Sequence, residues 1–172
     1  MRRDWERDFV EYVSARSLAL RRTAYLLCGD WHQAEDLTQV ALTKLYSVWR
    51  RLDQSTSVDG YVRRTLVRTF LDSKRRFWSR ERPRADLPDQ AAPVDLADER
   101  VTLRDALGAL PATQRAVIVL RYWDDLSVTE TAAVLDISEG TVKSAAARGL
   151  AALREVLQGS RMDGSSISGR GL

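Results

Sequence analysis

Residues 127–157 read SVTETAAVLDISEGTVKSAAARGLAALREVL, and this stretch decides the fold of the C-terminal half. Ser127 and Glu130 have the spacing of a capping box, so a short helix is expected to begin just after Ser127. Asp136 tolerates the left-handed conformation of a tight turn, and Ser138 can cap the helix that follows. Two helices joined by so short a turn predict a helix-turn-helix motif.

The apolar residues of this motif predict which side of its second helix faces the core. Ala132 is small where the two helices would cross, while Leu135, Ile137 and Val142 are apolar where the motif needs a core. If Val142 points inward, five residues are expected on the exposed face: Thr141, Lys143, Ser144, Ala147 and Arg148. Lys and Arg can reach phosphates or guanine edges, so this face is predicted to bind DNA. The alternative is an ordinary solvated helix face.

Helical periodicity also dominates the rest of the chain. Apolar residues recur at three- to four-residue spacing, and no long stretch alternates in the manner of a half-buried strand. We therefore expect an all-α fold of two small helical domains joined by a flexible linker. The expected helices cover residues 9–27, 31–52, 61–78, 99–109, 111–123, 127–135 and 138–157.

Composition predicts where the two domains begin and end. Residues 1–80 form the first expected domain and residues 99–157 the second. Between them, residues 81–98 are acidic and contain three prolines, which interrupt helices and favour an extended linker. Residues 158–172 are rich in Gly and Ser and are expected to form a disordered tail.

Charge is distributed unevenly along the chain. Residues 1–80 hold 16 Lys and Arg against 10 Asp and Glu, a net charge of +6, whereas residues 81–98 hold 2 against 5. The most basic stretch is residues 61–78, where cations alternate with apolar and aromatic residues. A basic first half predicts a polyanionic partner that the N-terminal domain contacts.

Several classes of function lack their sequence requirements. The single Cys28 cannot form an internal disulfide, and with one His the chain cannot assemble a zinc site from Cys and His alone. No Gly-rich phosphate loop or catalytic pair of carboxylates is evident, so we expect no enzyme activity, cofactor or metal. No membrane-spanning stretch or signal peptide is evident, which predicts a cytoplasmic protein without membrane contact.

Three segments resemble one protein family. Residues 110–154, LPATQRAVIVLRYWDDLSVTETAAVLDISEGTVKSAAARGLAALR, resemble region 4 of the extracytoplasmic-function sigma factors, group 4 of the sigma-70 superfamily. Residues 29–49, GDWHQAEDLTQVALTKLYSVW, resemble region 2.2, and residues 60–76, GYVRRTLVRTFLDSKRR, resemble regions 2.3 to 2.4. The resemblance implies a subunit that binds core RNA polymerase and directs promoter-specific initiation. Region 2 of the family docks on the polymerase clamp helices and opens the −10 element, while region 4 binds the flap and the −35 element.

The resemblance also implies roles for individual residues. The exposed face of the second motif helix would bind the −35 element. Polymerase would be bound by Glu35, Asp36 and Gln39, which lie off the apolar stripe of their helix. The −10 element would be bound by Arg68, Lys74, Arg75, Arg76 and Trp78. For Trp78 and its neighbour Phe77, packing in the core is the alternative to stacking on bases.

This chain departs from the family pattern at several positions. The family often has an acidic residue at position 40, Trp at 61 and Asn at 69, where this chain has Val40, Tyr61 and Thr69. In the second motif helix, Ala145–Ala147 replace an Arg followed by bulkier residues, so base contacts are expected to concentrate in the first turns.

The sequence leaves two alternatives open, one about the binding partners of the chain and one about its class of function. The sequence leaves open whether an anti-sigma factor binds the chain in addition to core polymerase and promoter DNA. The alternative class is a helix-turn-helix transcriptional regulator that acts without docking on core polymerase. That class does not account for residues 1–80, because such a regulator would carry a sheet-based receiver or ligand domain there.

Overall fold

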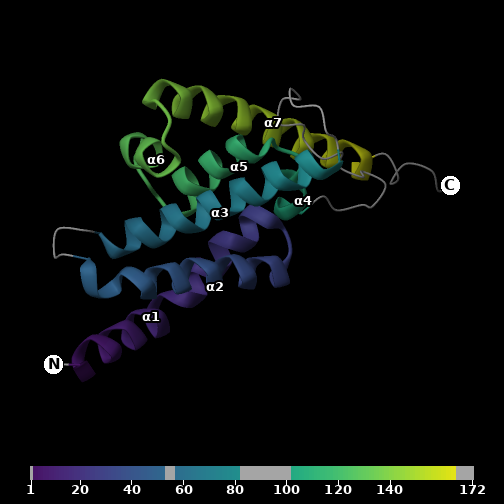
Figure 1. Ribbon diagram of the computed structural model, residues 1–172. Helices are drawn as coiled ribbons and strands as arrows, with labels where there is room; N and C mark the ends of the chain where they lie inside the picture. Colours follow the sequence, from purple (N-terminus) through teal and green to yellow (C-terminus); the bar gives the residue numbers. More distant parts are fainter. Residues whose placement is uncertain (1, 53–56, 82–101, 166–172) are drawn as a thin grey trace.

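The computed structural model describes residues 2–52, 57–81 and 102–165, and all regular elements in these ranges are helical (Figure 1). The predicted all-α class is confirmed. Side chains at residues 2–3, 78–81 and 160–165 lie outside the description. The elements are α1 (Arg2–Cys28), α2 (Trp31–Val48), the short η1 (Trp49–Arg51), α3 (Val58–Glu81), α4 (Leu103–Gly108), α5 (Ala112–Ile118), the π-helical η2 (Val119–Trp123), α6 (Val128–Leu135) and α7 (Glu139–Ser165).

The first domain comprises α1, α2 and α3, and its first turn forms for a local reason. Gly29 adopts φ 75° and its N–H donates to the carbonyl of Tyr25 at 2.7 Å, which ends α1. The carboxylate of Asp30 then accepts a hydrogen bond from the N–H of Gln33 at 2.9 Å and caps α2. The break expected between the helices over residues 9–27 and 31–52 is confirmed.

The start of α3 is held against α1 by a polar cluster around Asp59. The Tyr12 hydroxyl donates to Asp59 at 2.8 Å, and Arg16 donates to both carboxylate oxygens at 3.0 and 2.9 Å. Burial, together with this carboxylate, raises the pKa of the Tyr12 hydroxyl above its ordinary value, so the phenol stays protonated and remains a donor. These bonds hold the N-terminal end of α3 against α1.

The second domain comprises α4 to α7 and contains a π-helical turn. A regular helix was predicted over residues 111–123, but α5 ends at Ile118 and η2 follows, with the N–H of Asp124 donating to the carbonyl of Val119 at 3.0 Å. Asp125 then adopts φ 55°. The wider turn changes the direction in which Asp124 projects from the helix.

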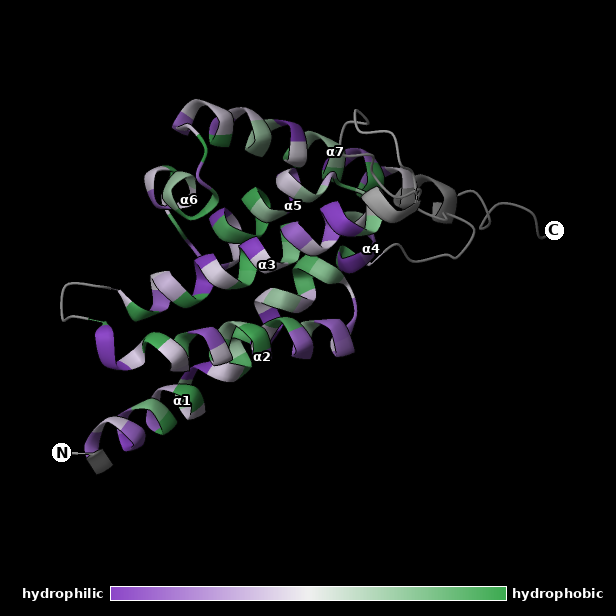
Figure 2. Cartoon of the chain, in the orientation of Figure 1, coloured by the Kyte–Doolittle hydropathy of each residue, from purple (hydrophilic) through white to green (hydrophobic). Residues whose placement is uncertain are grey.

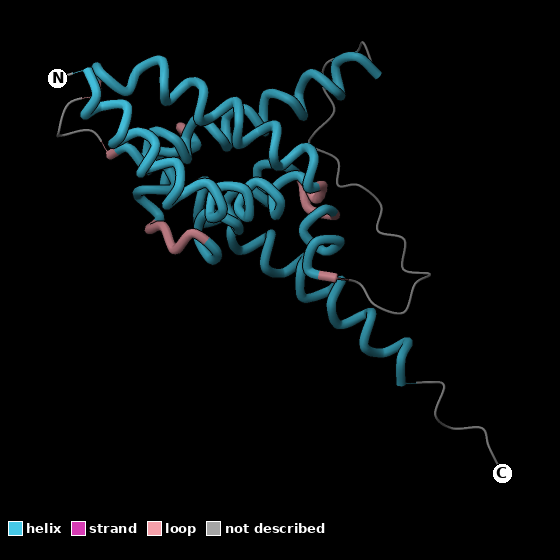
Figure 3. The backbone as a smooth tube through the Cα atoms, turned by 90° about the horizontal axis from the view of Figure 1, so that it is seen from below, coloured by secondary structure: helices cyan, strands magenta, loops and turns pink. Residues whose placement is uncertain are grey.

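The ends of two elements differ from the predictions. Helix α7 runs to Ser165, so the predicted end near residue 157 is wrong and helix extends into the stretch for which a disordered tail was predicted. Figure 3 shows this end of α7 projecting from the body. The predicted linker lies outside the described residues apart from Glu81, where α3 ends.

The two domains pack against each other through α3. This helix contacts α2 on one side and α5 and α6 on the other, and it lies between those layers in Figure 1. Hydrophobic and hydrophilic stretches alternate along the helices (Figure 2), which is the pattern of amphipathic helices around a core.

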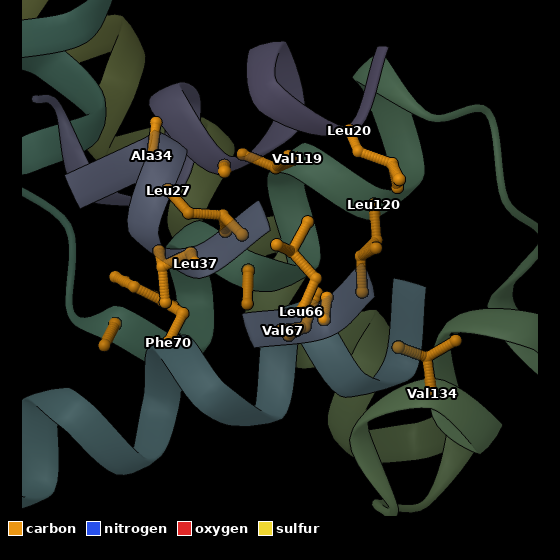
Figure 4. Close-up of a cluster of buried hydrophobic side chains, with 14 of the residues drawn as sticks. Leu20, Leu27, Ala34, Leu37, Leu66, Val67, Phe70, Val119, Leu120 and Val134 are labelled. Carbon is orange, nitrogen blue, oxygen red and sulfur yellow. The ribbon is translucent and has the colours of Figure 1, made fainter. Parts of the chain in front are cut away.

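One hydrophobic cluster contains buried residues from both domains. In Figure 4, Leu66 and Val67 of α3 lie near Leu120 of η2, and Leu20 of α1 lies near the same segment. All four are at most 8% exposed. The sequence predicted two domains but did not predict this contact between them.

Candidate DNA and polymerase interfaces

The helix-turn-helix forms as its local signals predict. The Ser127 hydroxyl accepts from the N–H of Glu130 at 3.0 Å, while the Glu130 carboxylate accepts from the N–H of Ser127 at 2.7 Å. The bond from the backbone of Ser127 holds the pKa of Glu130 below its ordinary value, because it favours the ionised carboxylate. Asp136 ends α6 at φ 56°, and the Ser138 hydroxyl accepts from the N–H of Thr141 at 3.1 Å.

The buried side of α7 packs on α5 and α6 through small residues. Val142 is fully buried and belongs to a cluster with Val117 and Ala132, against which Ile137 packs. This inward orientation of Val142 confirms the prediction. The five residues predicted on the opposite face are all exposed: Thr141, Lys143, Ser144, Ala147 and Arg148.

The three consecutive alanines of α7 do not lie on the same side of the helix. Ala145 and Ala146 are 8% and 9% exposed and face the core, so only Ala147 of the three belongs to the exposed face. Their small size therefore determines how closely α7 approaches α6, and it does not describe a surface that reads bases. The spacing of these alanines after Val142, three and four residues, is a core signal that the sequence already contained.

The hydroxyls and the cations on the α7 face differ in their local bonding. Thr141 and Ser138 hydroxyl oxygens lie 2.8 Å apart, and the Ser144 hydroxyl donates to the carbonyl of Thr141 at 3.2 Å. Among the residues that the structure describes, Lys143 and Arg148 make no ion pair or side-chain hydrogen bond. Two cations on an exposed helix face are therefore available to an anionic ligand.

The basic residues of α3 do not share one environment. Arg75 and Arg76 are exposed, whereas Lys74 is half-buried and its ammonium lies 5.9 Å from the centre of the Phe70 ring. Arg68 is exposed and lies 3.8 Å from the carboxylate of Asp136 in the turn of the helix-turn-helix. The predicted −10 residues thus follow α3 from its contact with α6 toward its C-terminal end.

Two aromatic residues, Phe77 and Trp78, lie near the end of α3, and the structure describes the side chain of the first only. Phe77 is 54% exposed, so it is not a core residue. Trp78 lies within α3, and its side chain is outside the described part of the chain. An exposed ring beside a basic segment has the composition of a surface that stacks on single-stranded bases.

The predicted docking residues lie together on α2. Glu35, Asp36 and Gln39 are all exposed, and Glu35 lies 3.4 Å from Arg21 of α1. A hollow of about 250 Å³ between α1 and α2 is bordered by Glu35, Gln39 and the half-exposed Leu18. This surface combines charge with exposed apolar area, as protein interfaces do.

Sequence reasoning missed two residues that join the domains. Asp124 accepts from Thr23 at 2.8 Å and from Arg63 at 3.0 Å. Arg115, which is 7% exposed, donates to the carbonyls of Leu27 and Leu110 at 2.6 and 3.0 Å. No local pattern indicates these bonds, because most of the partners are tens of residues apart in the sequence.

The described residues lack two further kinds of feature, a membrane-spanning helix and a cluster of metal ligands. None of the described helices combines the length and the hydropathy needed to cross a membrane. Over the same residues, His, Cys, Asp and Glu do not gather in any group of three or more that could hold a metal ion.

The architecture defines a helical protein with a helix-turn-helix motif in its second domain and a basic helix in its first. Family comparison agrees with this division: residues 13–80 match Sigma-70 region 2 and residues 100–153 match Sigma-70, region 4. The RNA polymerase sigma-E factor of Streptomyces coelicolor is 40% identical over 164 residues, covering 93% of this chain and 92% of the relative.

Two further relatives extend the comparison. The ECF RNA polymerase sigma factor SigL of Mycobacterium tuberculosis is 34% identical over 154 residues, covering 81% of this chain and 82% of the relative. The solved structure of the Bartonella quintana sigma factor RpoE, in complex with the anti-sigma factor NepR, has a TM-score of 0.67 at 28% identity and covers 88% of this chain and 97% of that one.

The chain belongs to the extracytoplasmic-function family of RNA polymerase sigma factors. It is a sigma factor that directs RNA polymerase to initiate transcription at promoters. The alternative of a regulator that acts without core polymerase is set aside, because the family match covers the first domain as well as the helix-turn-helix.

Proposed function

We propose that the exposed face of α7 reads the −35 element of promoter DNA. The observation that carries this proposal is the division of the helix into two sides. Val142, Ala145 and Ala146 are buried, while Thr141, Lys143, Ser144, Ala147 and Arg148 all remain exposed. Because the second helix of such a motif lies in the major groove with its N-terminal residues at base edges, the early residues should specify and the later ones should hold phosphate.

Lys143 and Arg148 test this division directly. In transcription with core polymerase on a library of randomised −35 sequences, Lys143→Ala should relax preference at one or two positions, at a cost of about 1–3 kcal/mol per lost base contact. Arg148→Ala should lower output evenly across all sequences, since a phosphate contact carries no base information.

Arg154 provides the control for these two variants. It is exposed on the same helix but lies more than a turn beyond Arg148. Arg154→Ala should leave both the total output and the sequence preference near the wild-type values. Loss of preference with Arg148→Ala alone would reverse the assignment, and failure of wild-type protein to give promoter-specific transcripts would remove it.

We also propose that α3 binds the −10 element and that α2 binds core polymerase. Arg68, Lys74, Arg75, Arg76 and Trp78 would follow the backbone and bases of the melted strand. Support comes from the exposure of Arg75 and Arg76 and from the exposed ring of Phe77 beside them.

The exposed carboxylates of α2 would bind the clamp helices of core polymerase. Asp36 tests this, because it is exposed and lies off the buried stripe of α2. Asp36→Arg should weaken binding to core polymerase by about tenfold, equivalent to about 1.4 kcal/mol, without lowering the melting temperature. The control is Asp72→Arg on α3, which should bind core polymerase as wild type does. Unchanged affinity in Asp36→Arg would exclude Asp36 from the docking face.

The proposal also includes the boundaries of the domains and a further protein partner. We assign residues 1–80 to polymerase docking and the −10 element, 81–98 to a linker and 99–157 to the −35 element, with the second domain also binding the flap of core polymerase. An anti-sigma factor is a further proposed partner, since the similar RpoE was solved with one. A non-enzymatic role in the cytoplasm and membership of group 4 belong to the same proposal.

A further inference from the structure

One carboxylate at the start of α7 is held by the helix that precedes it. Glu139 is the first residue of α7 and is exposed, and its carboxylate accepts a hydrogen bond from the hydroxyl of Thr129 at 2.8 Å. Thr129 is the second residue of α6, so this bond crosses the turn of the helix-turn-helix. Because Thr is branched at Cβ, its side chain has few rotamers, and its hydroxyl anchors the carboxylate in one place.

The bond to Thr129 stands in place of an ion pair that the sequence offers to Glu139 within its own helix. Lys143 follows Glu139 by four residues, which is the spacing of a helical ion pair. Among the residues that the structure describes, Glu139 bonds to Thr129 and forms no ion pair with Lys143. The first turns of α7 therefore present an anchored acceptor and, one turn later, a cation.

The carboxylate of Glu139 has capacity for a further hydrogen bond. The start of α7 is already capped by Ser138, whose hydroxyl accepts from the N–H of Thr141 at 3.1 Å. A carboxylate offers about four acceptor sites on two oxygens. Within the described part of the chain, the only side-chain hydrogen bond of Glu139 is the one from Thr129. Its other oxygen can therefore accept from a ligand.

The chemistry of a carboxylate restricts which base such an acceptor can bind. In the major groove the hydrogen-bond donors are the N4 amine of cytosine and the N6 amine of adenine. Adenine presents the acceptor N7 beside its amine, which repels a carboxylate, whereas cytosine presents its amine without an acceptor on the same base. A carboxylate at a base edge thus favours cytosine, and it also repels the phosphates of any sequence.

We infer, on the proposed function of α7, that Glu139 accepts a hydrogen bond from a cytosine of the −35 element and that Thr129 is its positioning residue. Four residues of α-helix rise about 6 Å, and base pairs follow one another at about 3.4 Å. The cytosine should therefore lie one or two base pairs from the position that Lys143 reads. Because the carboxylate repels phosphate, it lowers the affinity for sequences that lack the cytosine and so sharpens specificity.

Transcription with core polymerase on a library of randomised −35 sequences tests the base contact. Glu139→Ala should lower the preference for cytosine at one position by about tenfold, while output from the other sequences stays the same or rises. Glu155→Ala is the matched control, because it removes the same charge from an exposed position farther along the same helix. Equal sequence preferences in the two variants would overturn the contact.

Two variants of Thr129 test its positioning role. Thr129→Val removes the hydroxyl and keeps the shape of the side chain, so it should weaken the same cytosine preference by about threefold. Thr129→Ser keeps a hydroxyl and should restore the preference. A purely structural role would change the melting temperature or the total output and leave the preference at that position intact. That result in Thr129→Val would exclude Thr129 as a positioning residue.

A modified template tests the hydrogen bond itself. N4-methylcytosine keeps its pair with guanine but lacks the amine hydrogen that faces the major groove. At the assigned position it should lower the output of wild-type protein by about tenfold and change that of Glu139→Ala little. A loss of the same size in both proteins would contradict the contact.

The outcomes separate this contact from the function of α7. If Lys143→Ala relaxes preference at its own position while Glu139→Ala changes none, the contact is wrong and the proposed function stands. If wild-type protein with core polymerase selects no −35 sequence from the library, the proposed function fails and the contact fails with it.

Discussion

Helices α3 and α7 carry most of the cations that we assign to DNA, yet their surfaces differ in this conformation. The exposed face of α7 leaves Lys143 and Arg148 without an acidic partner among the described residues. In α3, by contrast, Arg63 and Arg68 both face carboxylates of the second domain. A helix that packs on one side leaves its opposite face exposed to solvent. A helix that lies between two layers, such as α3, has part of that face in contact with a neighbour.

The two helices therefore differ in how much of their surface is accessible in this conformation. The buried side of α7 packs within the second domain, so the opposite face of this helix is exposed. Part of the α3 face, by contrast, is in contact with the second domain.

The largest effect is expected at Arg115, which ties the second domain to α1. Arg115→Met leaves the buried carbonyls of Leu27 and Leu110 without their donor, at a cost of about 2–4 kcal/mol in the free energy of unfolding. Urea denaturation of the full chain measures this, with the exposed Arg154→Met as control. A loss below about 0.5 kcal/mol would show that Arg115 does not hold the domains together.

Gly149 tests the buried side of α7. A Cβ at this position would lie 2.8 Å from Cγ1 of Ile118, so Gly149→Ala should cost about 1–2 kcal/mol even after the gain in helix propensity. Gly159→Ala on the same helix meets nothing within 4 Å and should stabilise the chain by up to about 1 kcal/mol. Thermal unfolding compares the two, and equal melting temperatures would contradict the close packing of α5 on α7.

The C-terminal part of α3 tests the cations that we assign to the −10 strand. Replacing Lys74, Arg75 and Arg76 together by Ala should slow promoter opening by about tenfold and lower its salt dependence by about one unit per lost phosphate contact. Permanganate footprints of the −10 region measure opening. The control replaces three exposed cations elsewhere in the first domain, namely Arg7, Arg22 and Lys44. Equal opening in both triple variants would indicate that the α3 cluster is only solvated.

The smallest effect concerns the capping box that starts α6. Because bonds from Ser127 lower the pKa of Glu130 in the folded chain, ionised Glu130 stabilises the fold above the ordinary carboxyl range. This contribution is lost as the pH falls through the lowered pKa. Glu130→Gln should therefore lower the melting temperature slightly at neutral pH and not in acid. Glu155→Gln, at an exposed position of α7, is the control, and a deficit in Glu130→Gln that persisted in acid would argue against an ionic origin.

Short-range signals account for what could be predicted. Ser127 and Glu130 are three residues apart, and both bonds of their capping box form as predicted. The exposure of Lys143 follows from the helical period once Val142 is placed inward. The same period places Ala145 and Ala146, three and four residues after Val142, on the buried side of α7.

The all-α class, the helix-turn-helix and the family follow from the sequence alone, because caps, turns and helical periodicity are encoded over a few residues. The departure of η2 from the α-helical path and the core that α3 shares with the second domain became evident only in the three-dimensional structure. The same is true of the hydrogen bond between Thr23 and Asp124, which lie 101 residues apart in the chain. Such contacts depend on how whole helices pack, and local propensity carries no information about them.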